Sequence, residues 1–118
     1  MRFGWREQEG AIVGIDDETI QQIVQRLLSV AKPQRIILFG SAATGQMTRD
    51  SDIDLLILEE NPGDTRRESV RLRTALRGMG YPFDVIVMRL ERFEETRDII
   101  GGIAFPAQKY GRVIYEAA

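Results

Sequence analysis

The sequence predicts an α/β fold, a small mixed sheet of three to four main strands flanked by helices. Apolar runs of four residues, typical of strands covered on both faces, recur at three places in the chain. Before the first run, and again between the second and third, apolar residues repeat at the spacing of an amphipathic helix. Helices that alternate with buried strands form layers on a sheet, so a single layered domain is expected.

The composition is that of one domain spanning residues 1–118, with residues 1–16 as an N-terminal arm. The chain is 43% hydrophobic and carries a net charge of -2, and a chain of this length buries enough apolar surface to fold without metal or disulfide support. It contains neither Cys nor His. Disulfides, thiolate or imidazole zinc sites and catalytic imidazoles are therefore excluded, and carboxylates, hydroxyls, Lys and Arg remain for chemistry.

Charge and hydropathy also limit the expected location and binding partners of the protein. No apolar stretch approaches the ~20 residues that a membrane-spanning helix needs, and the first ten residues lack the apolar core of a signal peptide. We expect a cytoplasmic protein with no membrane contact. The 16 basic and 18 acidic side chains give no case for strong nucleic-acid binding. Fourteen of the basic residues are Arg, which suits phosphate or carboxylate partners but equally a solvated surface.

The predicted elements follow one another with short connections. In order they are a short strand 11–13 in the arm, a helix from 17 that Pro33 ends, a strand 35–39, a short helix 42–44, a strand 53–58, a helix 65–77, a strand 83–88, a helix 91–98, a helical turn 106–110 and a strand 112–115.

The first helix and the first strand of the sheet are predicted from two different patterns of apolar residues. Apolar residues recur at i, i+3, i+4 and i+7 from Ile20 to Ala31, and Asp16 and Asp17 can cap the helix that they predict. The run over 35–39 is continuously apolar after its first residue, which indicates a strand buried on both faces.

The second half of the chain is divided by turn residues. Asn61-Pro62-Gly63 marks a turn, and Asp64 can cap the helix that follows. This helix has an apolar stripe of Val70, Leu72, Ala75, Leu76 and Met79, and arginines at 66, 67, 71, 73 and 77 on the remainder of its surface. Gly111 can cap the last helical turn. Glu59 and Glu60 are expected to be the solvated end of a strand.

A phosphate-binding bend is suggested by Gly40-Ser41, which lies between a buried strand and a short helix. Such a bend presents free backbone N–H groups, glycine permits close approach, and the serine hydroxyl is a further donor. Two known phosphate motifs are excluded, because Gln46 and Met47 replace the Lys and Ser/Thr of a Walker A loop and Ala42 breaks the dinucleotide fingerprint. Strands also end in Gly-Ser without any such role.

Three aspartates open the second and third predicted strands. Asp52 and Asp54 are two residues apart, so their side chains point to one face, and Asp84 begins the next strand. If these strands are neighbours, the three carboxylates meet. Their hard oxygen atoms suit Mg²⁺, which takes further ligands from substrate phosphates, and two ions would clamp an in-line displacement. The alternative is that residues 50–52 form an ordinary polar turn.

These residues resemble a known family. Gly40-Ser41, ten intervening residues and Asp52-x-Asp54 are similar to the G-S-x10-D-x-D signature of the nucleotidyltransferase superfamily that includes DNA polymerase beta. For this composition, a chance match at that spacing is expected on the order of one or two times in a thousand. A single small domain looks like the minimal nucleotidyltransferases, and the resemblance extends from residue 17 to Tyr115. It implies the nucleotidyltransferase fold.

The resemblance also implies a reaction and its residues. It implies a transferase that moves AMP from ATP to an acceptor hydroxyl with two Mg²⁺ ions, or Mn²⁺ in their place. Asp52 and Asp54 would bind both metals, and Asp84 would hold the catalytic one and favour deprotonation of the acceptor. Gly40 and Ser41 would hold the triphosphate.

Partners are implied in the same way. Minimal members commonly pair with HEPN-type ribonuclease toxins, and some transfer AMP to a tyrosine of the toxin, so the implied partner is such a toxin and the implied role is that of its antitoxin. A homo-oligomer is a further expectation for so small a domain.

One position departs from the family pattern. Many minimal members have Arg directly after Gly-Ser, where this chain has Ala42. Arg49 lies near enough in sequence to substitute, although a solvated turn arginine is the simpler interpretation. A second function therefore stays open, a binding module with little or no catalysis that acts through a partner protein. An antibiotic nucleotidyltransferase is disfavoured, because such enzymes complete the acceptor site with an additional domain.

Overall fold

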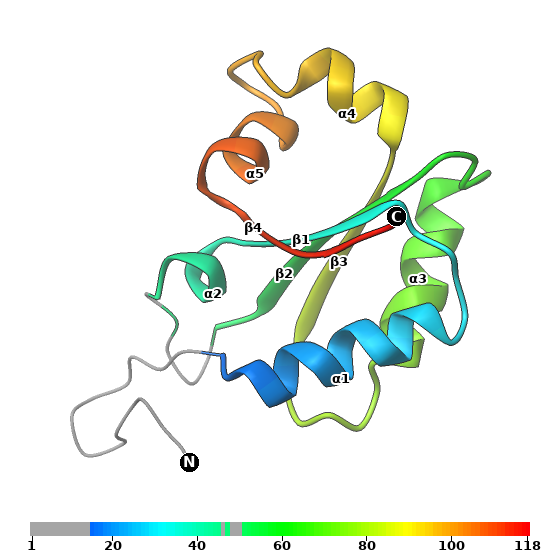
Figure 1. The fold of residues 1–118 in the computed structure, drawn as a ribbon, viewed down its shortest axis with the longest axis vertical. Helices are drawn as coiled ribbons and strands as arrows, with labels where there is room; N and C mark the ends of the chain where they lie inside the picture. The colour runs from blue at the N-terminus through cyan, green and yellow to red at the C-terminus, as the bar shows by residue number, and fades with distance from the viewer. Residues whose placement is uncertain (1–14, 46, 48–50) are drawn as a thin grey trace.

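In a computed structural model of the chain, which describes residues 15–45, 47 and 51–118, four strands form one mixed sheet between two helical layers (Figure 1). The strand order is β3-β2-β1-β4. β1 pairs antiparallel with β2 and with β4, whereas β2 and β3 run parallel. The predicted α/β class and the mixed sheet are confirmed.

The elements agree in type with the predicted ones and differ at their ends. In order they are α1 (Asp17–Leu28), β1 (Arg35–Phe39), α2 (Ser41–Thr44), β2 (Ile53–Glu59), α3 (Thr65–Ala75), β3 (Phe83–Arg89), α4 (Leu90–Thr96), α5 (Ala104–Tyr110) and β4 (Arg112–Glu116). The strand predicted at 11–13 lies outside the described residues. Within the described part of the chain, every helix is too short or too polar to cross a bilayer.

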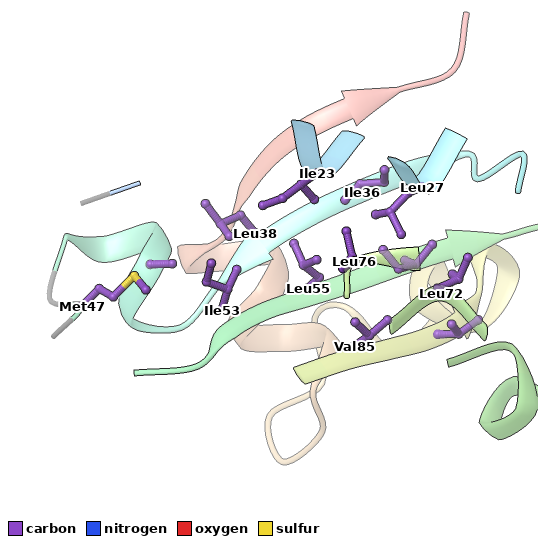
Figure 2. Packing of buried hydrophobic residues seen from close by; sticks show 13 residues of the cluster. Ile23, Leu27, Ile36, Leu38, Met47, Ile53, Leu55, Leu72, Leu76 and Val85 are labelled. Atoms are coloured by element: carbon purple, nitrogen blue, oxygen red, sulfur yellow. The ribbon is translucent and has the colours of Figure 1, made fainter. Parts of the chain in front are cut away.

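The sheet separates two apolar cores. On one face α1 and α3 cover the strands, and β2 contributes Leu55 and Ile57 to this core (Figure 2). On the other face α4 and α5 cover Leu56 and Leu58, together with Phe93 of α4. The central residues of β2 therefore alternate between two cores, as expected for a strand buried on both faces.

The first helix ends earlier than the sequence predicts. α1 ends at Leu28, so Ala31 lies beyond it, although the Ala31 N–H still donates to the carbonyl of Leu27 (3.0 Å). The residue before a proline avoids helical backbone geometry, and the chain leaves the helix ahead of Pro33. Ala31 nevertheless packs against the core next to α1.

The apolar stripe of α3 was also predicted too broadly. Leu72 and Leu76 are buried, but Val70 is 51% exposed. Val70 is two positions from Leu72, about 200° around a helix, so it lies outside the buried face of α3. The helix itself ends at Ala75, two residues before the predicted end.

Gly111 is the C-cap of α5, as the sequence predicts, and a close contact explains why the residue is glycine. Its backbone is extended, with φ of -80°. A Cβ at this position would overlap the carbonyl oxygen of Ala107 and lie 2.6 Å from Cγ2 of Ile37. Glycine is therefore required here because α5 passes close to β1.

Candidate active site

The register of β2 and β3 brings two of the predicted aspartates side by side. Asp54 is directly paired with Asp84 in this parallel pair of strands, so both side chains leave the sheet on the same face. Asp52 lies two residues before Asp54, just ahead of β2. The three aspartates predicted to meet at one end of the sheet are thus brought to that end by the fold.

The charges of these carboxylates act on one another. Burial raises the pKa of Asp54, and the negative charges of Asp84 and then Asp52 raise it further. In the part of the chain that the structure describes, no Lys or Arg forms an ion pair with any of the three. The repulsion is therefore uncompensated by the described residues, and a cation from solution would relieve it.

The Gly40-Ser41 bend lies against the same carboxylate. Phe39, the last residue of β1, is paired with Asp54, and Gly40 follows with φ of +69°. A Cβ at Gly40 would overlap Oδ2 of Asp54. Glycine is required here both for the left-handed backbone and for the close approach.

The bend also presents backbone donors. In α2, the N–H groups of Ala43 and Thr44 donate to the carbonyl of Gly40 (3.1 and 3.3 Å). The earlier N–H groups of Ser41 and Ala42 are helix-initial donors, which have no acceptor within a helix. Donors beside a carboxylate cluster are an arrangement that suits a phosphate accompanied by a cation.

The position that departs from the family pattern has a structural role. Ala42 is 8% exposed and belongs to the core under α1 and α3. Its side chain therefore packs inward, and a long cationic side chain at this position would have to leave that core. Arg49, considered as its substitute, lies outside the described residues.

The donor set fits a metal ion that arrives with a nucleotide. Among residues 15–45, 47 and 51–118, no three acidic side chains form a group close enough to hold a metal by themselves. Asp52 and Asp84 are exposed, whereas Asp54 is half-buried. Mg²⁺ is commonly held by one or two carboxylates together with substrate phosphates, so these oxygen donors and the adjacent Gly40 bend match its requirements.

One acidic residue lies in an environment that sequence reasoning did not foresee. Glu59, expected to be solvated, is 8% exposed, and its Oε2 has no hydrogen-bond partner. Burial and the neighbouring Glu68 raise the pKa of Glu59 to about 7. Its neighbour Glu60 is exposed, as predicted. The local sequence contained no signal for this burial, because Glu68 belongs to α3 and reaches Glu59 through the fold.

Comparison with known proteins identifies the same type of domain. A family model described as a nucleotidyltransferase domain matches residues 18–110. A crystal structure of a toxin–antitoxin with AMP-PNP aligns with a TM-score of 0.57 at 21% identity, over 83% of this chain and 73% of that chain. The toxin–antitoxin MntA–HpeT, in a mutant with two Asp-to-Glu changes, aligns with a TM-score of 0.56 at 20% identity, over 83% and 73% of the two chains.

A third solved structure, a candidate nucleotidyltransferase from Sulfolobus solfataricus, has a TM-score of 0.56 at 19% identity, over 82% of this chain and 78% of that chain. No curated protein sequence matches the chain. At these identities the solved structures establish a shared fold, and the match to the family model extends over most of the chain.

Proposed function

The chain belongs to the nucleotidyltransferase domain family, and on that premise we propose that it transfers AMP from ATP to an acceptor hydroxyl in the presence of Mg²⁺. The observation that carries the proposal is the pairing of Asp54 with Asp84 beside the Gly40 bend. Uncompensated carboxylates next to backbone donors favour a ligand that combines cation and phosphate, as a metal–nucleotide complex does.

Each site residue has a proposed role in this reaction. Asp52, Asp54 and Asp84 would hold the metal, and the backbone of Gly40 and Ser41 would receive the triphosphate. When bound, Mg²⁺ neutralises phosphate charge and polarises the phosphoryl oxygens. The acceptor oxygen forms a bond to the α-phosphorus while the bond from that phosphorus to the bridging oxygen breaks, and pyrophosphate leaves.

The acceptor hydroxyl would give its proton to the carboxylate of Asp84 as this bond forms. The protein's part in the reaction is therefore to position the two reactants and to complement their charge.

For the acceptor, we propose a tyrosine of a HEPN-type toxin, which makes this chain the antitoxin of a pair. Two observations support it. The exposure of Asp52 and Asp84 leaves the site open to an acceptor as large as a protein, and solved structures with the same fold include toxin–antitoxin complexes, one of them with AMP-PNP.

The test is incubation with labelled ATP, Mg²⁺ and the product of the adjacent reading frame. Label should appear on a tyrosine of that partner with the wild-type chain and should disappear with Asp54→Asn. The matched control is Asp98→Asn, which makes the same change at an exposed aspartate beyond α4. Label transfer at the wild-type level by a folded Asp54→Asn variant would reject the mechanism.

The second candidate function is a binding module with little or no catalysis. The inward packing of Ala42, where many family members have Arg, favours it. Mg-ATP separates the two candidates, because any ligand that binds the native state alone raises the melting temperature. An increase supports the transferase, whereas an unchanged melting temperature together with partner binding supports the module.

A further inference from the structure

β3 is an edge strand that is not protected in the usual ways. β3 is the outermost strand in the order β3-β2-β1-β4, so one side of its backbone has no neighbouring strand in the described sheet. Its central residues, Val85 to Met88, are all apolar, whereas proteins commonly place Lys, Pro or a bulge on an exposed edge. The backbone of β3 is therefore available to pair with a further strand.

A groove of about 290 Å³ runs along this edge between β3 and α3. Val85, Ile86 and Val87 all line it. Because consecutive side chains of a strand point to opposite faces, three consecutive residues can line one groove only where it reaches the strand's edge. Val85 and Val87 belong to the core under α1 and α3, and Ile86 packs against the other core. The groove thus opens onto the backbone of β3.

The other wall of the groove is one stripe of α3. Arg66, Ser69, Val70 and Arg73 line it, at the i, i+3, i+4 and i+7 positions that share a helix face. In the described part of the chain, neither Arg66 nor Arg73 has an acidic partner. α3 contains four Arg and one Glu in a chain whose net charge is -2. Positive charge is therefore concentrated on the helix beside the open edge.

We propose that this groove binds an extended acidic segment of a partner protein, which pairs with β3 as an additional strand. Its carboxylates would contact Arg66 and Arg73 on the α3 side, and its alternate apolar side chains would point to the other face of the sheet. The two arginines are two turns apart, about 10 Å along the helix. Side chains on one face of an extended chain recur at about 7 and 13 Å, so flexible Arg side chains reach either spacing.

A nucleic acid is the competing occupant of an arginine surface. The apolar lining from Val70, Val85 and Val87 offers no contact to a phosphate backbone, and an unpaired strand edge matches a peptide backbone instead. The observations therefore favour a peptide. This inference goes beyond AMP transfer and does not depend on it, so its test contains no nucleotide.

The first measurement is fluorescence anisotropy with a labelled, acetylated peptide of about ten alternating Glu and Val residues, roughly the length of a long strand. The double variant Arg66→Glu/Arg73→Glu should weaken binding about tenfold or more, because each reversed charge repels the peptide. Arg92→Glu reverses one exposed charge on α4, and it should change the affinity by less than about twofold because it lies outside the groove.

A second probe tests the backbone pairing. The same peptide with Pro in place of two Val residues keeps its charge and loses two N–H donors, so it should bind at least about fivefold more weakly. Hydrogen exchange of the amides of residues 84–88 should slow when the original peptide binds the wild-type chain.

Four results would overturn the proposal. They are the absence of peptide binding, equal binding of the proline peptide, undiminished binding by the charge-reversed variant, and tighter Arg-dependent binding of a single-stranded oligonucleotide than of the peptide.

Discussion

Strand β2 carries carboxyl groups at both of its ends, and the two ends differ in whether a cationic side chain of the protein lies beside them. At its start, burial and the charges of Asp84 and Asp52 raise the pKa of Asp54, and no described cation is paired with this group. At its other end, burial and Glu68 raise the pKa of Glu59 to about 7.

The far end differs because the chain supplies its own cation there. Arg71 donates two hydrogen bonds to Glu68 (2.9 and 2.8 Å) and a third to the carbonyl of Val30 (2.6 Å). Arg71 thereby lowers the pKa of Glu68, and a proton on Glu59 completes the neutralisation near neutral pH. This end is compensated from within, so it links α3 to the sheet and needs no ligand.

The two ends of β2 therefore differ in whether their carboxyl groups are available for function. Negative charges that a fold gathers without a counter-charge destabilise it, and such groups persist where a ligand uses them. The start of β2 fits that description and its other end does not.

The largest expected effect is a difference in AMP-transfer activity between substitutions at the two ends of β2. Asp54→Asn should reduce AMP transfer by about 10³-fold or more, since it removes charge that the transition state requires. Glu59→Gln, the matched change at the other end, should leave transfer within about threefold, because it lies outside the site. The measurement is the initial rate with labelled ATP, with circular dichroism to confirm folding. Similar losses of transfer rate in the two variants would show that Asp54 has no greater role in the reaction than Glu59.

A second substitution tests the close approach of Gly40 to Asp54 at the start of β2. Gly40→Ala should lower the free energy of unfolding by about 2–4 kcal/mol, because it adds backbone strain and an overlap with Asp54. Gly45→Ala is the matched control: its φ is +78°, yet a Cβ there meets nothing within 4 Å. It should cost about 1 kcal/mol, from strain alone. Urea unfolding measures both, and equal costs would show that the contact with Asp54 contributes nothing.

The third prediction concerns pH at the compensated end. The pKa of Glu59 is raised from 4.5 to about 7, so between these values the native state holds a proton that the unfolded state has released. The free energy of unfolding therefore falls as pH rises through this window. Glu59→Gln removes the dependence, and relative to wild type it should be more stabilising at pH 8 than at pH 4 by about 1–3 kcal/mol.

The control for this pH experiment is Glu60→Gln, the same change at the exposed neighbour. A wild-type curve that coincides in shape with that of Glu59→Gln would show that Glu59 does not carry the linkage.

The smallest expected effect is that of Mg²⁺ alone. Because no described Lys or Arg is paired with the aspartates at the start of β2, millimolar Mg²⁺ should stabilise the wild-type chain by about 0.5 kcal/mol, or roughly 2 °C in melting temperature. Glu59→Gln should keep this shift and Asp54→Asn should lose it. A shift that persists in Asp54→Asn would place the ion elsewhere on the molecule.

Much of the fold and the grouping of the site residues could be predicted locally. The predicted strand 53–58 and the two aspartates lie in one short segment, and strand periodicity predicts that Asp52 and Asp54 share one face, although β2 itself begins at Ile53. Their meeting with Asp84 required one assumption, that the two strands are neighbours, which the structure confirms. The roles of these residues in catalysis stay a prediction.

The two errors have different causes. The sequence places Val70 in the apolar stripe of α3, but Val70 is exposed, and its position about 200° around the helix from Leu72 is a local feature that excludes it from that stripe. Glu59 is expected in solvent but is buried, because α3 packs beside the end of β2, which no window of neighbouring residues contains.

The kinds of element, their order, and the chemistry open to a chain without Cys or His follow from local periodicity and residue type. The contact between Gly40 and Asp54, the hydrogen bonds from Arg71 to Glu68 and the open edge of β3 arise only from packing between distant segments. Contact and burial depend on distances between segments far apart in the chain, and those distances exist only once the sheet has formed.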